Sequence, residues 1–230
     1  MRKLTEQELK LVQTAIIAKE ISVLEVLAEI YDHYISHLEG FPEAEFKNEL
    51  ANLESKWTYP YCRTLQDEFS KNVNKSIRSL QWKLIKSYFT WPKILSTAIF
   101  FGVLFSLGQL LTPKVFSFST IIPLIIIIQV FNFYLIFSAR KKYKGLRTIF
   151  NFKSTGLWLN SAESNSLSVA IGTPISVFNL LIFAPRIFDL NLGISNQTLF
   201  LILVFIAFFI SVISFSAYEA WKIKSKTALL

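Results

Sequence analysis

The sequence predicts an all-α membrane protein. A small cytosolic helical domain, made of three short helices and a long linking helix, precedes a four-helix transmembrane bundle. Composition is the first observation behind this prediction: 52% of the residues are hydrophobic and only 17% are charged, which is too apolar for a soluble domain. Position is the second. Apolar residues gather in four runs after residue 90, whereas the earlier residues have the mixed composition of soluble helices.

The first apolar run, 94–111, carries no charged side chain. A helix of these eighteen residues, at about 1.5 Å per residue, is roughly 27 Å long, close to the roughly 30 Å hydrocarbon core of a bilayer. Three later runs are similar. We therefore expect a transmembrane domain at 91–221, with spans at about 94–111, 118–139, 167–184 and 199–217.

Charge is distributed unevenly along the chain. Residues 1–60 carry six Lys or Arg against eleven Asp or Glu, although the whole chain has a net charge of +8. Basic residues precede the first span, follow the second and fill the tail, 222–230. Such residues mark cytoplasmic flanks and attract anionic membrane lipids, so we expect a multi-pass protein of the cell inner (plasma) membrane with both termini cytoplasmic. Residues 143–159 mix aromatic and basic side chains, which favours the membrane interface. The acidic N-terminal domain argues against a nucleic acid partner.

The acidic N-terminal domain, 1–60, has apolar residues at helical spacing. Two segments in it, Thr5–Glu8 and Ser22–Glu25, match the capping box, in which a hydroxyl and a Glu satisfy the free N–H groups of a helix start. These signals predict three helices, at 5–20, 22–39 and 42–57.

Residues 61–90 are predicted to form a basic juxtamembrane helix that links the two parts of the chain. Thr64 is placed to cap it, and an apolar stripe runs along it from Phe69 through Ile77 to Leu84. Three short helices bury too little surface to be very stable alone. We therefore expect the stripe to complete their core.

Glu29, Asp32, His33 and His37 share one face of the second predicted helix. Two imidazoles one turn apart with a carboxylate can bind zinc. The rest of a metalloprotease helix is missing, however, and the single cysteine, Cys62, supplies no ligand pair. We predict no catalytic residue, metal or cofactor, and we interpret the face as a solvated or domain-packing surface that is the candidate site for a partner.

Small and amide side chains in the predicted spans are candidates for helix packing. Small residues four apart let helices approach closely. Neutral amides either hold helices together or line a substrate path, and both interpretations stay open. The small residues are Ala98, Gly102, Ser106, Ala207 and Ser211, and the amides are Gln129, Asn132 and Asn179. No ionisable residue lies at mid-depth in these runs, which argues against a pump or an ion-coupled transporter.

Residues 27–33 read Leu-Ala-Glu-Ile-Tyr-Asp-His, and Phe46 and a stripe of Leu and Trp follow. This pattern resembles uncharacterised bacterial multi-pass membrane proteins whose N-terminal part is similar to the helical HAAS signalling domain. The resemblance covers about residues 1–90. In that family an acidic three-helix domain precedes several spans, and some members are associated with PadR-type transcriptional regulators. The resemblance implies a signalling or regulatory module and carries over no catalytic residue.

These observations favour a non-enzymatic integral membrane protein of signalling or regulatory type, whose cytosolic domain binds a protein partner. A second hypothesis is an accessory subunit of a membrane transport or export complex, docked through the small-residue faces, which would also suit a homo-oligomer. A third is a membrane-embedded lipid-modifying enzyme. The third is the weakest, because it needs paired polar catalytic groups at the cytoplasmic boundary and the sequence shows no such pair.

The charge distribution predicts a topology that reporter fusions can test. Fusions after Lys114 and after Asp189 should report the outer side, and fusions after Lys144 should report the cytoplasm. The opposite signal at any of these positions would contradict the topology.

Overall fold

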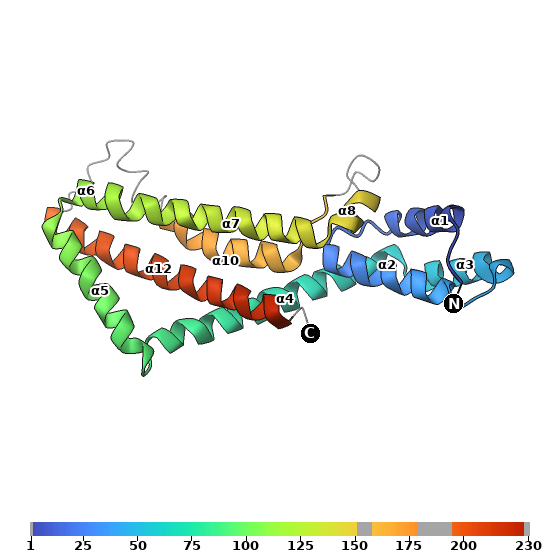
Figure 1. Ribbon diagram of the computed structural model, residues 1–230, viewed down its shortest axis with the longest axis horizontal. Coiled ribbons are helices and arrows are strands. Elements are labelled where there is room, and N and C mark those ends of the chain that lie inside the picture. Colours follow the sequence, from blue (N-terminus) through green and yellow to red (C-terminus); the bar gives the residue numbers. More distant parts are fainter. Residues whose placement is uncertain (1, 151–157, 179–194, 228–230) are drawn as a thin grey trace. The chain divides into compact units, whose positions relative to one another are not determined.

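The computed structural model describes residues 2–150, 158–178 and 195–227. The regular elements within these ranges are helices, which confirms the all-α fold class (Figure 1). An isolated parallel bridge between Val23 and Asn160 is the single β-type pairing that these ranges contain. Asn179 and the end of the third predicted span lie outside the described residues.

The first 90 residues form three short helices and one long one, as the periodicity predicts. The long helix carries the apolar residues of the predicted linking segment. The elements are α1 (Glu6–Ile17), α2 (Leu24–Leu38), the 3-10 turn η1 (Glu43–Glu45), α3 (Phe46–Lys56) and α4 (Tyr59–Tyr88).

The later part of the chain is dominated by long apolar helices. A π-helical segment, η2, leads directly into the second of them. The elements are α5 (Lys93–Leu110), α6 (Pro113–Phe116), η2 (Ser117–Ile121), α7 (Ile122–Lys142), α8 (Lys144–Ile149), α10 (Ala162–Phe178) and α12 (Asn196–Thr227).

Three helices of the described chain are long and apolar enough to cross a membrane. They cover Lys93–Leu110, Ser119–Lys142 and Gln197–Lys224, with mean hydropathies of 1.6, 2.3 and 2.8. These helices indicate a membrane protein. The third predicted span begins in α10, whose described part ends at Phe178.

The chain divides into two compact units. The first contains Met1–Lys75 and Ile136–Asn165, and the second contains Ser76–Leu135 and Ser166–Leu230. Three helices, α4, α7 and α10, contribute residues to both units. The connection that follows α7 therefore belongs to the same unit as the N-terminal helices.

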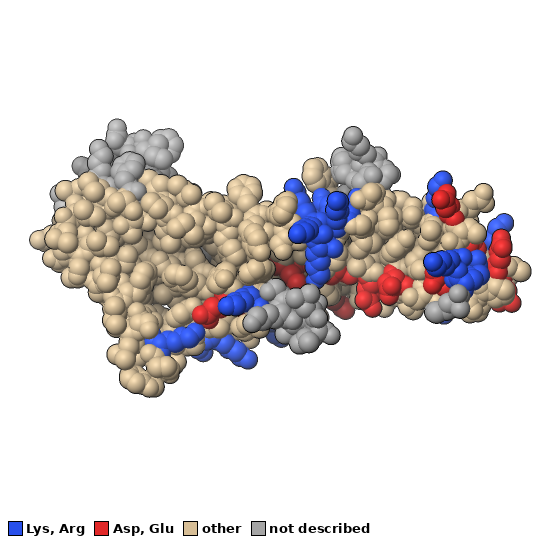
Figure 2. Space-filling view, in the orientation of Figure 1, with Lys and Arg blue, Asp and Glu red and all other residues tan. Residues whose placement is uncertain are grey.

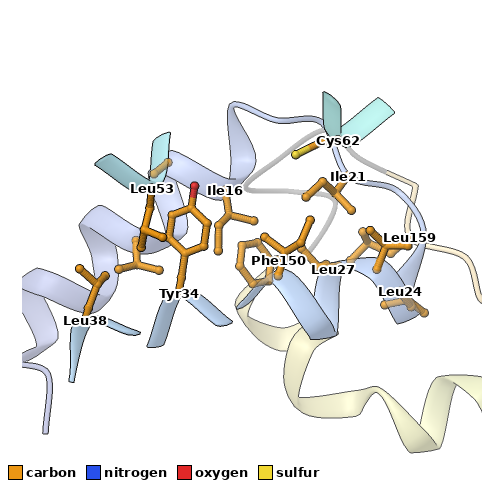
Figure 3. Close-up of a cluster of buried hydrophobic side chains, with 14 of the residues drawn as sticks. Ile16, Ile21, Leu24, Leu27, Tyr34, Leu38, Leu53, Cys62, Phe150 and Leu159 are labelled. Atoms are coloured by element: carbon orange, nitrogen blue, oxygen red, sulfur yellow. The ribbon is translucent and has the colours of Figure 1, made fainter. Parts of the chain in front are cut away.

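The core of the first unit combines the N-terminal helices with that connection (Figure 3). Phe150 is 1% exposed and lies among the buried side chains of α1 and α2, with its ring 5.5 Å from that of Tyr31. Leu159 is buried in the same cluster. The placement of 143–159 at the membrane interface is therefore wrong for these two side chains, because a protein core covers them.

Two expected helix starts are wrong. Ser22–Glu25 does not form a capping box: α2 begins at Leu24, and its N-cap residue, Val23, makes no side-chain cap. The long helix begins at Tyr59 and not near Thr64, whose hydroxyl donates to the Pro60 carbonyl at 3.0 Å. A proline in the first turn of a helix loses no hydrogen bond, which explains the earlier start.

The apolar stripe of α4 is divided between the units. Cys62 is buried in the core of the first unit, and Leu65 and Phe69 pack against that core. Ile77 is 1% exposed but belongs to the second unit. The expectation that the stripe completes the N-terminal core therefore holds for Phe69 and is wrong for Ile77.

The capping box at the start of α1 is confirmed and carries an ion pair. The Glu8 N–H donates to the Thr5 hydroxyl, and the Thr5 N–H donates to the Glu8 carboxylate at 2.8 Å. The Arg2 guanidinium donates twice to the same carboxylate, at 2.6 and 2.9 Å, and once to the Phe41 carbonyl. Hydrogen bonding from Arg2 is the main reason that the pKa of Glu8 falls to about 2.

Acid should weaken the first unit through Glu8. Its pKa is about 2 in the folded protein against an ordinary 4.5, so the ionised carboxylate stabilises the fold above pH 4.5. That stabilisation is lost as the pH falls from 4.5 towards 2. Glu8→Gln should therefore lose less stability than the wild type between neutral pH and about pH 3, as measured by thermal unfolding. Equal losses in both proteins would contradict this role.

Shortening a core side chain should destabilise the first unit. Leu27 is 1% exposed, so Leu27→Ala should lower the free energy of unfolding by about 2–5 kcal/mol through lost burial and a cavity. The matched control is Leu11→Ala, because Leu11 is 46% exposed. Denaturant unfolding of the detergent-solubilised chain measures both. Equal effects would show that Leu27 is not in a packed core.

Candidate functional site

The predicted partner face on α2 is partly used inside the first unit. Glu29, Asp32 and His33 are exposed, and His37 is half-buried. His37 Nε2 lies 2.9 Å from Glu49 Oε2 on α3, and this contact is the main reason that the pKa of Glu49 is lowered. The face thus keeps two exposed carboxylates beside a histidine that contacts the neighbouring helix.

The same face shows no metal-binding arrangement. Within residues 2–150, 158–178 and 195–227, no group of three or more His, Cys, Asp and Glu side chains could hold an ion. The His33 ring packs 5.5 Å from the Trp57 ring. Cys62 is fully buried, and burial raises the pKa of its thiol, so the reactive thiolate is disfavoured.

The predicted small-residue face of α5 is not packed against the described part of the chain. Ala98, Gly102 and Ser106 are exposed, and a Cβ added at Gly102 would meet nothing within 4 Å among the described atoms. The close approach occurs at Gly108, where an added Cβ would overlap the Phe200 ring and lie 2.9 Å from Val204. Gly108 thus allows α12 to pack against α5.

The small residues of α12 are buried. Ala207 is 0% exposed, and the Ala207 carbonyl accepts from the Ser211 hydroxyl at 2.8 Å. The amides of α7 do not form a joint site: Gln129 is exposed, and Asn132 has a buried Oδ1 with no partner in the described chain. Ala207 and Ser211 are therefore packed, whereas Gln129 is not, and both interpretations of the amides stay open.

A polar cluster that the sequence did not reveal lies where α5 begins. Lys93 Nζ is 3.3 Å from Glu219 Oε2 on α12 and 4.8 Å from the centre of the Tyr88 ring. Burial, and then the Glu219 charge, raise the pKa of Tyr88. The Thr97 hydroxyl donates to the Tyr88 carbonyl at 2.8 Å. The cluster ties the end of α4 to both α5 and α12.

A second polar network in the first unit joins α2 to the start of α10. Glu25 projects from the first turn of α2, and its carboxylate accepts from the Ser161 hydroxyl at 2.5 Å and the Ala162 N–H at 3.0 Å. A longer contact of 3.5 Å comes from the Glu163 N–H. The carboxylate thus accepts hydrogen bonds from free N–H groups of the kind that every helix start presents. These N–H groups belong to α10, which lies far along the sequence from α2.

Main-chain hydrogen bonds reinforce the junction. The Leu24 N–H donates to the Asn160 carbonyl and the Asn160 N–H donates to the Ser22 carbonyl, each at 2.9 Å. Arg147 Nη1 donates to the Leu159 carbonyl at 3.2 Å. Burial, and then the charge of Glu25, raise the pKa of Tyr143 nearby. The segment before α10 is therefore held to α2 by both backbone and side chains.

The groups of this junction fix the position of one helix start against another. Glu25, which is expected to cap its own helix, caps α10 instead. Ser161 also caps α10, since its hydroxyl accepts from the Ser164 N–H at 3.2 Å. In the sequence, Ser161 with an acidic residue two positions later indicates the start of α10. No local pattern indicates that Glu25 contacts it.

No family model, curated protein or solved structure matches the chain. The resemblance of residues 1–90 to the HAAS domain therefore stays a prediction.

Removing the Glu25 carboxylate should loosen the start of α10. Loss of a helix cap costs about 0.5–2 kcal/mol, so Glu25→Ala should speed amide hydrogen exchange at Ala162 and Glu163 by roughly 2- to 30-fold. The matched control is Glu29→Ala, one turn later on α2 and exposed. Unchanged exchange in Glu25→Ala would contradict the cap.

Proposed function

We propose that the chain is a non-enzymatic signalling or regulatory protein of the cell inner membrane, in which the N-terminal helices bind a partner and pass its effect to the membrane helices. The junction between Glu25 and the start of α10 is the observation that carries this proposal. A binding event that shifts α2 would change how the first turn of α10 is held.

Helix α10 is the element that would carry the signal. Its first residues, from Ala162 to Asn165, belong to the first unit, and the residues from Ser166 to Phe178 belong to the second. The helix is continuous from Ala162 to Phe178, so a change at its start would pass into the residues that belong to the second unit. A partner can shift this arrangement only by binding one state of the first unit more tightly than the other.

The partner surface is proposed to be the exposed acidic face of α2. Glu29 and Asp32 are both exposed, and the exposed His33 lies on the same face, about one turn after Glu29. Two carboxylates on a fixed helix face favour a partner with a basic surface, because complementary charge steers association. The partner is therefore proposed to be a soluble protein that presents Lys or Arg.

The proposed membrane arrangement has four spans, based on α5, α7, α10 and α12, with both termini in the cytoplasm. Figure 2 shows Lys and Arg gathered near the α7–α8 junction, beside an uncharged surface over α7. Arg140, Lys141, Lys142 and Lys144 are exposed there. Basic residues directly after an apolar span favour the cytoplasmic leaflet and its anionic lipids.

The exposed face of α5 supports a second candidate function, an accessory subunit of a membrane transport or export complex. Ala98, Gly102 and Ser106 leave open space on that helix. A helix from a membrane partner, or from a second copy, could approach closely there.

A pull-down from mild detergent separates the two functions. The full chain should retain a soluble partner, and the double variant Glu29→Lys with Asp32→Lys should lose it, because the charge of the face is reversed. The control, Glu6→Lys with Glu45→Lys, changes two exposed carboxylates elsewhere in the unit by the same charge. A membrane protein retained by both variants, with no soluble partner, would favour the accessory subunit.

A further inference from the structure

A pocket of about 440 Å³ opens in the first unit between the α1–α2 loop and the first turns of α4. The loop supplies Glu20 and Ser22 to its wall, and α4 supplies Arg63, Gln66 and Asp67. The volume lies in the range of small-molecule sites. The lining is largely polar and charged, so the pocket suits a small polar molecule.

The pocket brings together both signs of charge without pairing them. Glu20, Arg63 and Asp67 make no ion pair within 4 Å among the described residues. Arg63 instead has Nη1 3.3 Å from the Tyr59 hydroxyl, which also lines the pocket. One guanidinium and two carboxylates are thus available to a ligand that carries an anionic and a cationic group.

Gln66 supplies a fixed polar group at the pocket wall. Its side chain is 7% exposed, and Oε1 accepts from the Ser22 N–H at 2.8 Å and from the Val23 N–H at 3.2 Å. These bonds fix the orientation of the amide, and its Nε2 has no hydrogen-bond partner in the described chain. The buried side-chain atoms that lack a partner in the described chain are others, so this nitrogen is open to water and can donate to a ligand instead.

Glu20 is held in an unusual backbone conformation beside the pocket. Its φ is 52°, in the left-handed region that residues with a side chain rarely adopt. Glycine would relieve this strain. A left-handed residue commonly ends a helix, and the Glu20 N–H donates to the Ile17 carbonyl at 3.0 Å just after α1. This conformation places a carboxylate at the rim of a pocket that also contains Arg63.

We propose that this pocket binds a small zwitterion of the amino-acid class. The ligand carboxylate binds the Arg63 guanidinium, with Gln66 Nε2 as a second donor. The ligand ammonium binds the carboxylates of Glu20 and Asp67. Each charged group of the ligand then has a partner of opposite sign, and each unpaired charge of the pocket is used.

The pocket is continuous with the junction to α10. Gln66 holds Ser22, and the Ser22 carbonyl accepts from the Asn160 N–H at 2.9 Å. A ligand on Gln66 and Arg63 would therefore stabilise the loop that forms the junction. This second step rests on the proposed function, whereas binding itself does not.

The test is a thermal unfolding screen of the detergent-solubilised full chain against each of the twenty common amino acids, with acetate and methylammonium as single-charge probes. At least one amino acid should raise the unfolding midpoint saturably, and the two single-charge probes should not. No saturable shift with any amino acid at about 10 mM, or an equal shift with acetate, would overturn the proposal.

Variants then locate the site by calorimetry with the amino acid that binds. Arg63→Gln and Asp67→Asn should each weaken binding by about tenfold or more, because each removes one charged partner. Both side chains are exposed, so the fold should tolerate the change. The control is Arg78→Gln, an exposed arginine of α4 that does not line the pocket. Equal affinity in Arg63→Gln, Asp67→Asn and the wild type would overturn the proposed site.

Hydrogen exchange at Ala162 and Glu163 separates the pocket from the proposed function. The ligand should slow exchange there in the wild type, and Glu25→Ala should bind the ligand without that effect. Binding with no change of exchange in the wild type would uphold the pocket and contradict coupling. No binding in the wild type, with the Glu25 cap intact, would overturn the pocket and leave the junction standing on its own evidence.

Discussion

The start of α10 presents N–H groups that have no acceptor within their own helix, and a carboxylate from α2 satisfies them. Glu25 accepts from Ser161 and Ala162, residues that lie 136 and 137 positions further along the chain. The rest of the first unit depends on this contact between Glu25 and the start of α10. It aligns the backbone pairing of Val23 with Asn160, and it brings Phe150 and Leu159 into the core formed by the N-terminal helices.

Local signals predicted much of the fold and little of this junction. The capping box at Thr5–Glu8 is predictable because all its groups lie within one turn. The similar pattern at Ser22–Glu25 forms no capping box, because Gln66 accepts from the Ser22 N–H and hydroxyl and Glu25 accepts from the start of α10. Both competitors come from distant parts of the chain. A short pattern defines which bonds a residue can make, and tertiary packing decides which of them form.

Local sequence patterns also predict the apolar helices better than their packing. Length and composition predicted helices that could cross a bilayer, and three described helices have both properties. Packing faces were harder to predict, because α5 is apolar on all sides and its small residues mark more than one face. Ala98, Gly102 and Ser106 remain exposed, whereas Gly108, one turn beyond the buried Leu104, meets α12. The exposed face of α2 that carries Glu29 and Asp32 stays a predicted partner site, whereas the junction at the first turn of α2 has no local sequence signal.

Disulfide trapping in native membranes tests the central claim most directly. Paired residues of a β-bridge have Cα atoms about 5 Å apart, within the range of about 4.4–6.8 Å that a disulfide spans. Val23→Cys with Asn160→Cys, in a Cys62→Ala background, should therefore form an intrachain disulfide rapidly under mild oxidation. Leu11→Cys with Asn160→Cys, which pairs Asn160 with an exposed residue of α1, is the control and should not. Failure of the first pair to cross-link, or equal cross-linking of both pairs, would contradict a fixed junction between α2 and the start of α10.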